Sequence, residues 1–173
     1  MATVSVSIEQ YLEQRRIPFT SVPHRPAFTA QEEAAAAHVR GREWAKTVVC
    51  FADDEPILAV LPAPYVIALD DLRRLAGART LRLASEDEMK ALYPDCEVGA
   101  MAPLGPLYGQ RVFVDRALAA AQELVFDAGT HAKAIRMQYA DFAEVTRPVV
   151  GAFGARPTPG PRHRPRMPSA PLF

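Results

Sequence analysis

Runs of apolar residues along the chain predict a fold that mixes strands with short helices. Residues 47–51 and 57–61 are two apolar runs separated by the acidic segment from Asp53 to Glu55. This pattern predicts two buried strands joined by a tight, solvated turn. Similar but shorter apolar runs predict further strands at residues 17–23, 80–83, 111–115, 124–127 and 132–137, with residues 129–131 as the turn between the last two.

Capping patterns indicate where the helices begin. A Ser or Thr followed three residues later by Gln or Glu can satisfy free N–H groups at a helix start, and this occurs at Ser7–Gln10, Thr29–Glu32 and Ser85–Glu88. The predicted helices begin after residue 7, run from residue 29 to about 38, with Gly41 ending that region, and span 86–92. Shorter helices are expected near residues 71–75 and around Phe142 and Val145. Strands outnumber helices, so we expect an α+β fold with a mixed, partly barrel-like sheet and helices packed outside.

The chain length and the distribution of charge predict one domain followed by a tail. The chain has 173 residues, of which 49% are hydrophobic, enough for a substantial core. Residues 155–173 hold six prolines and four arginines but no acidic residue. Such a segment cannot bury enough apolar surface to offset its ordering entropy. We therefore expect a folded domain at residues 1–154 and a disordered Pro/Arg-rich tail at 155–173.

Composition argues against several classes of protein. The net charge is zero, so no overall field draws the protein to a polyanion, and any nucleic-acid contact must be local. The longest nearly uncharged stretch, Pro56 to Leu69, is too short to cross a bilayer, and no basic apolar leader is visible. Two cysteines, Cys50 and Cys96, do not form a disulfide framework. We expect a cytoplasmic protein that binds neither membranes nor DNA.

Motifs for cofactors and metals are absent from the sequence. It has no phosphate-binding loop of the Gly-to-Lys-Ser type and no paired-glycine dinucleotide fingerprint. Its four histidines do not form a helical zinc pair, and neither cysteine has a neighbouring cysteine. The sequence therefore predicts no cofactor and no metal.

Lys46 is the most informative single residue. The chain has seventeen arginines but only three lysines, and this one opens the apolar strand that begins at Thr47. A lysine at the mouth of a buried strand is a compact donor that can anchor a carbonyl, carboxylate or phosphate oxygen. The alternative is an ammonium that simply reaches water at the strand end.

A second candidate is the loop from Gly99 to Pro106, in which fixed proline torsions alternate with permissive glycines. Such a loop lets the backbone approach a ligand closely.

Three motifs in order resemble one known family. They are Ala45-Lys46-Thr47 entering a hydrophobic strand, the Gly-x-x-x-Pro motif at residues 99–103, and Ala128-Gly129-Thr130-His131 ahead of a late strand. The chain from about Ser7 to Phe153 resembles the YbaK and prolyl-tRNA synthetase-associated editing domain. The tail lies outside this resemblance.

This resemblance implies a free-standing deacylase that hydrolyses the ester of a mischarged tRNA, usually alanine or cysteine on the proline tRNA. The partners that the resemblance implies are the 3′ end of an aminoacyl-tRNA and an aminoacyl-tRNA synthetase. Lys46 matches the essential lysine of the family and would bind the phosphate or ribose end of the substrate or polarise its ester. The residues implied to line the substrate pocket are Gly99, Ala100, Met101, Ala102, Pro103, Gly129, Thr130 and His131.

Other interpretations remain open at this level. A domain of this fold could bind tRNA ends or a synthetase without catalysis, and a small-molecule binder unrelated to RNA fits the lack of a basic patch. His131 is equally compatible with a substrate contact and with an ordinary hydrogen-bonded loop residue. Cys50, between Val49 and Phe51, is expected to be a buried hydrophobe rather than a nucleophile.

Overall fold

The hairpin predicted around the acidic turn forms the centre of the fold. The computed structural model describes residues 7–157, and within them β2 (Ala45–Ala52) pairs antiparallel with β3 (Glu55–Pro62) along their whole length. Asp53 and Asp54 both have positive φ, +47° and +69°, as a two-residue hairpin turn of the primed type requires. The exposed Asp53 carboxylate accepts hydrogen bonds from the backbone N–H groups of Arg79 and Thr80, which ties the turn to the next segment.

This hairpin extends into a mixed sheet of five strands. Their order is β5–β2–β3–β6–β9, with β5 at Leu81–Leu83, β6 at Arg111–Asp115 and β9 at Val149–Gly151. β6 runs parallel to β3, and β9 runs parallel to β6, whereas β5 is antiparallel to β2. A short separate pair, β4 (Val66–Ile67) and β10 (Gly154–Ala155), is antiparallel.

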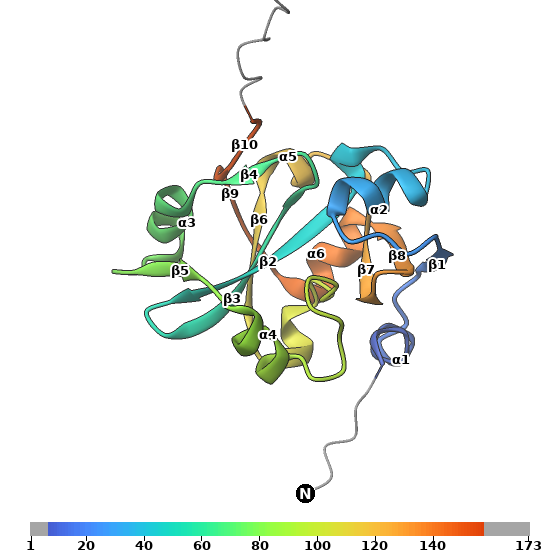
Figure 1. Cartoon of the computed structure of the whole chain (residues 1–173), viewed down its shortest axis with the longest axis horizontal. Helices are drawn as coiled ribbons and strands as arrows, with labels where there is room; N and C mark the ends of the chain where they lie inside the picture. Colours follow the sequence, from blue (N-terminus) through green and yellow to red (C-terminus); the bar gives the residue numbers. More distant parts are fainter. Residues whose placement is uncertain (1–6, 158–173) are drawn as a thin grey trace, which may run out of the picture.

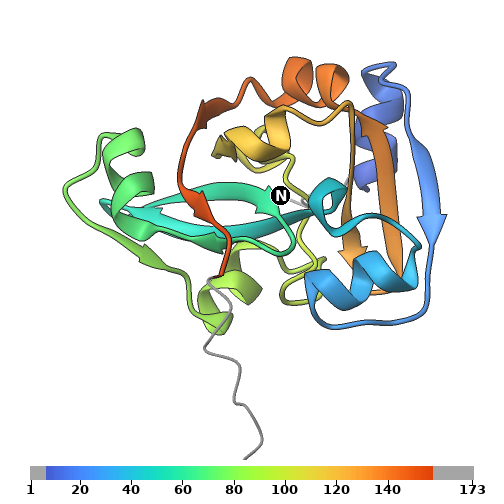
Figure 2. The same ribbon diagram turned by 90° about the horizontal axis from the view of Figure 1, so that it is seen from above.

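A second, antiparallel sheet lies beside the first. It has the order β1–β8–β7, with β1 at Thr20–Pro23, β8 at Lys133–Gln138 and β7 at Glu123–Thr130. A bridge between Trp44 and Val125 links β7 to the start of β2. Figure 2 shows the two sheets on either side of one interior, without closing into a barrel. The prediction of a mixed, partly barrel-like α+β fold is confirmed.

Short helices pack around these sheets (Figure 1). They are α1 (Ile8–Gln14), α2 (Ala30–Ala36), α3 (Leu69–Ala76), α4 (Glu86–Leu92), α5 (Arg116–Ala119) and α6 (Tyr139–Thr146). Two 3₁₀ turns lie at Gly41–Glu43 and Gly105–Tyr108. The three predicted caps all form, since the side chains of Ser7, Thr29 and Ser85 accept from the backbone three residues ahead.

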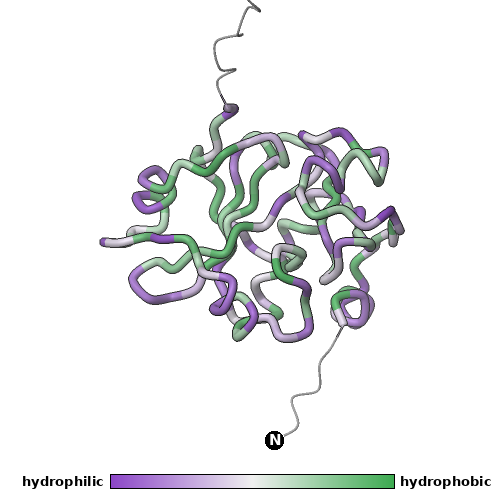
Figure 3. The backbone as a smooth tube through the Cα atoms, in the orientation of Figure 1, coloured by the Kyte–Doolittle hydropathy of each residue, from purple (hydrophilic) through white to green (hydrophobic). Residues whose placement is uncertain are grey.

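Three apolar clusters lie on the faces of the sheets. The first lies between the two sheets, the second on the other face of the large sheet near α3, and the third between the small sheet and α2. β3 is buried from Ile57 to Pro62, because its residues alternate between the first two clusters. The apolar course of the chain through this hairpin is visible in Figure 3.

Two details of the prediction are corrected. Gly129 and Thr130 do not form a turn, because they continue β7 to a pair between Thr130 and Lys133, with an irregular register between Asp127 and Thr130. The turn is confined to His131 and Ala132. Ala155, assigned to the tail, pairs with Val66 in β10. Arg156 and Pro157, also assigned to the tail, belong to no helix or strand, and residues 158–173 of the predicted disordered tail lie outside the described residues.

Among the helices at residues 7–157, none is both long enough and apolar enough to span a bilayer.

Gly105 provides a test of packing beside the predicted loop. A Cβ at this position would lie 2.3 Å from the carbonyl oxygen of Gln110 and 2.5 Å from Cγ2 of Val112. We expect Gly105→Ala to lower the free energy of unfolding in urea by about 2–3 kcal/mol, because overpacking displaces buried backbone. Gly109→Ala is the control: its φ is +67° but no atom lies within 4 Å, so a loss of about 1 kcal/mol is expected. Equal losses in the two variants would contradict this packing.

Candidate functional site

Two of the three predicted motifs meet in the structure. The N–H of Glu97 donates to the carbonyl of Gly129 at 2.8 Å, and the N–H of Gly129 donates to the carbonyl of Ala100 at 2.9 Å. These bonds lay the loop before Pro103 against the irregular end of β7. Gly99 and Gly129 adopt φ of +86° and +93°, a conformation that disfavours any residue with a side chain. The glycines therefore allow this backbone contact.

His131 joins this loop to α2. Its backbone N–H donates to Oε2 of Glu97 at 2.8 Å, and its Nε2 lies 2.9 Å from the carbonyl oxygen of Val98. Its Nδ1 lies 2.6 Å from Oε1 of Glu33. Both ring nitrogens thus have partners, and the residue is 8% exposed. In this structure His131 is a hydrogen-bonded connector between segments, one of the two roles that the sequence left open.

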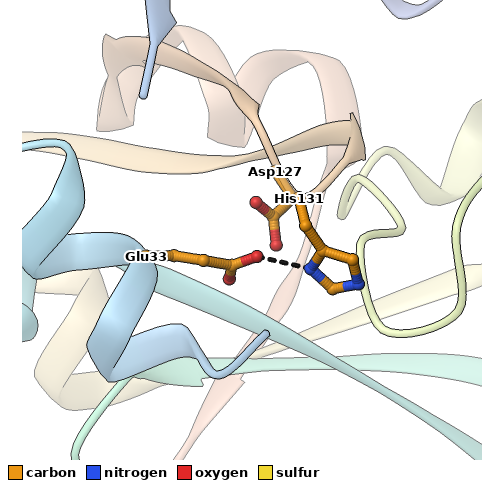
Figure 4. A group of neighbouring side chains, drawn as sticks. All are labelled: Glu33, Asp127 and His131. Atoms are coloured by element: carbon orange, nitrogen blue, oxygen red, sulfur yellow. Dashed lines mark hydrogen bonds and ion pairs between the residues drawn. The ribbon is translucent and has the colours of Figure 1, made fainter. Parts of the chain in front are cut away.

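Asp127 completes a buried cluster with Glu33 and His131 (Figure 4). Glu33 lies on α2, whose N-terminus Thr29 caps, and Asp127 lies on β7 on the same side as Val125, which packs in the cluster under α2. One ligand atom from each of the three side chains lies within 4.8 Å of the others. Oδ1 of Asp127 is buried and has no hydrogen-bond partner within the described residues.

Burial and mutual repulsion shift the protonation of this cluster. Burial, followed by repulsion from Glu33, raises the pKa of Asp127 to about 9. Burial lowers the pKa of His131, but its bonds to Glu33 and to the Val98 carbonyl, with the charges of Glu33 and Glu97, outweigh burial, so the pKa lies above its ordinary value. At neutral pH the fold thus favours a protonated Asp127, and the contact with Glu33 shifts His131 towards its imidazolium form.

Glu33 and Asp127 were not predicted from the sequence, which also predicted no metal. The donor set of two carboxylates and one imidazole is chemically able to hold a cation. The available signal was an acid at the end of the apolar run Leu124–Val125–Phe126, where a charge needs a partner. A spacing rule could not reveal the cluster, because Glu33 and His131 are 98 residues apart.

Lys46 lies in a separate environment. Its ammonium donates to the backbone carbonyl of Tyr65. No ion pair within residues 7–157 includes it, and burial lowers its pKa. The ammonium is therefore partly desolvated and is not neutralised by a carboxylate of the described chain.

The alternation of side chains along β2 places Lys46 on the face of the strand opposite to the core cluster that contains Met101 of the loop. In β2, Ala45 and Val49 belong to the cluster between the sheets, whereas Cys50 belongs to the cluster near α3. Lys46 and Cys50 are four residues apart, so their side chains lie on the same face of β2. Leu61, which pairs with Lys46 across the hairpin, also belongs to that second cluster. Met101, in contrast, lies in the first cluster. The hydrogen bonds that unite the other two motifs do not include Lys46.

The remaining predicted pocket residues divide between core and surface. Met101 and Ala102 are 2% and 0% exposed within the first cluster, and Pro103 is buried as well. They support the loop from the core and do not present an open apolar wall. Gly99 and Thr130 are exposed. Exposed Phe28, which the sequence did not single out, lies with its ring 5.5 Å from that of His131.

The cysteines show the expected structural character. Cys50 is fully buried, and burial raises its pKa to about 12, as expected for a small hydrophobe. Cys96 is partly exposed beside Gly129, and burial also raises its pKa. Neither thiol has the electropositive surroundings of a nucleophile.

A cleft lies away from all the predicted site residues. It encloses about 590 Å³ between the turn at Gly41–Glu43, α5 and the start of β7, and it is lined by Arg42, Glu43, Ala117, Ala120, Ala121, Gln122 and Glu123.

The raised pKa of Asp127 predicts how stability changes with pH. A group protonated in the folded chain but ionised in the unfolded chain makes unfolding easier as pH rises between the two pKa values, here from about 4 to about 9. Asp127→Asn cannot ionise, so we expect it to be more stable than the wild type by more than about 1 kcal/mol at pH 8 in EDTA. The difference should shrink towards pH 4. Asp54→Asn, at an exposed turn, should show no such trend, and a destabilised Asp127→Asn at pH 8 would contradict the assignment.

Comparison with known proteins identifies relatives of this chain. The sequence profile described as "Aminoacyl-tRNA editing domain" matches residues 24–145. Two proline–tRNA ligases of Nitratidesulfovibrio vulgaris, from strains DP4 and Hildenborough, are each 34% identical over 109 residues, 62% of this chain. The matched part is 18% of each ligase, so this chain corresponds to less than a fifth of their length.

Solved structures share the fold. Hypothetical protein APE2540 has a TM-score of 0.76 at 22% identity, over 86% of this chain and 99% of that one. A candidate trans-editing enzyme for prolyl tRNA synthetase has a TM-score of 0.73 at 21% identity, over 86% and 94% of the two chains. The matched profile covers Lys46, the loop at 99–103 and Gly129 to His131, and the chain belongs to the aminoacyl-tRNA editing domain family.

Proposed function

We propose that this protein is a free-standing deacylase that hydrolyses the ester of a mischarged aminoacyl-tRNA. The observation that carries the proposal is the half-buried ammonium of Lys46, which has a backbone carbonyl as partner and no carboxylate among the described residues. A partly desolvated cation of this kind gains by binding an additional oxygen atom that carries negative charge.

The chemistry suits such a site because an aminoacyl ester is already activated. The protein needs to position the ester and to stabilise the charge that develops on its carbonyl oxygen. In the proposed reaction Lys46 moves its hydrogen bond from the Tyr65 carbonyl to the substrate oxygen. The oxygen of water then bonds to the carbonyl carbon and releases a proton, the bond from that carbon to the ribose oxygen breaks, and the ribose oxygen takes up a proton to leave as a free hydroxyl.

The loop at residues 99–103 would contact another part of the substrate. Gly99 is exposed and carries no side chain, and backbone hydrogen bonds hold the loop to Gly129, so the backbone at Gly99 is open to a ligand. Lys46 and this loop are held on different sides of β2, so we assign the ester to Lys46 and the nucleotide end to the loop. Exposed Phe28, beside His131, offers a face on which a base could stack.

Alanine or cysteine on the proline tRNA is the proposed substrate. The support is the similarity to the proline–tRNA ligases and to the candidate trans-editing enzyme. A pocket distinguishes one methylene by only about 1–3 kcal/mol, so the choice between these two amino acids is an experimental question.

A deacylation panel tests the proposal. Wild-type protein is incubated with alanyl- and cysteinyl-tRNA for proline, with prolyl-tRNA, and with several other mischarged tRNAs, and loss of the ester is followed with time. We expect hydrolysis of at least one mischarged tRNA and a fall of about 100- to 1,000-fold in Lys46→Ala, the range for loss of one donor to a developing oxyanion.

Lys90→Ala is the matched control, because Lys90 is an exposed lysine on α4 and its loss should leave the rate unchanged. Lys46→Arg adds a test of geometry, since a planar guanidinium does not reproduce a compact ammonium, and a reduced rate is expected. Absence of hydrolysis across the panel, or full activity in Lys46→Ala, would reject the proposal.

The second candidate is a module that binds tRNA ends or a synthetase without turnover. The separation of Lys46 from the loop favours it, because the described structure does not bring the three motifs to one point. Salt-dependent tRNA binding with no loss of ester would support this function. A small-molecule binder would show neither a salt-dependent affinity for tRNA nor hydrolysis.

A further inference from the structure

We propose that Glu33, Asp127 and His131 form a binding site for one divalent transition-metal cation of the zinc type. The inference goes beyond the proposed deacylase activity and does not depend on it. It rests on the arrangement of three buried side chains from α2, β7 and the turn after β7 (Figure 4).

The ligand atoms have the spacing of a site that needs only a small adjustment. They all lie within 4.8 Å of one another, and Nδ1 of His131 and Oε1 of Glu33 are 2.6 Å apart. Zinc–ligand distances of about 2.0–2.2 Å place two ligands of a tetrahedral ion about 3.3–3.6 Å apart. An ion would therefore widen the short contact and draw the third ligand in.

A hydrogen bond at Nε2, the ring nitrogen that does not face Glu33, fixes the orientation of His131. Nε2 donates to the carbonyl oxygen of Val98 at 2.9 Å, since a carbonyl can only accept. This bond holds a proton on Nε2 and presents Nδ1 to Glu33 and Asp127. Metal-bound histidines commonly donate their second ring N–H in this way.

A buried oxygen atom of Asp127 without a hydrogen-bond partner is a second, independent indication of a bound ligand. Its side chain points into the cluster in Figure 4, the residue is 6% exposed, and Oδ1 has no hydrogen-bond partner in the described part of the chain. No lysine or arginine of residues 7–157 pairs with Asp127 or with Glu33. In the absence of an ion, protons on this cluster offset the charge of its two buried carboxyl groups, and a divalent cation would displace those protons on binding.

The types and number of ligand atoms indicate which class of metal this site would bind. One nitrogen and two carboxylates match zinc and similar transition metals, with a water molecule as the fourth ligand. Calcium needs six to eight oxygen ligands, more than this cluster offers.

Metal binding to the full chain tests the proposal without tRNA. The protein is treated with EDTA, dialysed and titrated with Zn²⁺ by calorimetry and with Co²⁺ by visible absorption. We expect one ion per chain, tetrahedral Co²⁺ bands that Zn²⁺ abolishes, and a rise in Tm of about 5 °C or more at a hundredfold excess over Kd.

Two variants and one control assign the ion. Asp127→Asn and Glu33→Gln, each verified as folded by circular dichroism, should weaken binding at least 100-fold and abolish the Co²⁺ bands. His38→Asn replaces an exposed histidine with positive φ and should bind as the wild type does. Absence of a stoichiometric ion in the wild type, or unchanged binding in both cluster variants, would overturn the proposal. Because tRNA takes no part, failure here leaves the deacylase proposal standing, and the reverse also holds.

Discussion

The burial of β3 on both faces is the constraint on which the rest of the structure depends. An apolar strand without polar positions can be stable only between two apolar layers, so the chain must cover it from the first cluster and from the second. Its partner β2 then alternates between the same layers. Because of that alternation, the side chain of Lys46 lies on the face of β2 where it contacts Tyr65, and the other face of β2 packs in the first cluster, which supports the loop. A one-residue shift in register would exchange the two sides.

Buried charge in the cluster of Glu33, Asp127 and His131 imposes a second constraint. Glu33 and Asp127 are 2% and 6% exposed, and carboxylates at such depth must be paired, protonated or bound to a cation. The bond to His131 satisfies Glu33 and, through Val98 and Glu97, holds the loop to the end of β7. The polar cluster therefore determines where the loop at residues 99–103 lies. This loop is one of the segments that the sequence motifs associate with function.

Membership of the editing domain family does not by itself specify what these two regions do. The region matched in the related ligases makes up less than a fifth of their length. APE2540 and the candidate trans-editing enzyme, in contrast, are matched over almost their entire chains. The matched region is thus a small part of the ligases, whereas the shared fold makes up almost all of the two solved chains. A half-buried ammonium and a glycine-lined backbone are suited to stabilising charge and to close approach, and neither needs a strong nucleophile of the protein.

The sequence by itself determined the local structure and the motifs. Capping pairs predicted the starts of α1, α2 and α4, and the acidic turn predicted the central hairpin, because these features depend on neighbouring residues only. It also made Lys46, Gly99 and Gly129 candidates for the site, through their resemblance to a family. Tertiary structure alone decided that Glu33, Asp127 and His131 meet, that Met101 and Ala102 are core, and that Lys46 lies across β2 from them. Contacts between segments nearly a hundred residues apart depend on sheet order and on which face of a strand is covered, and short sequence patterns do not encode either.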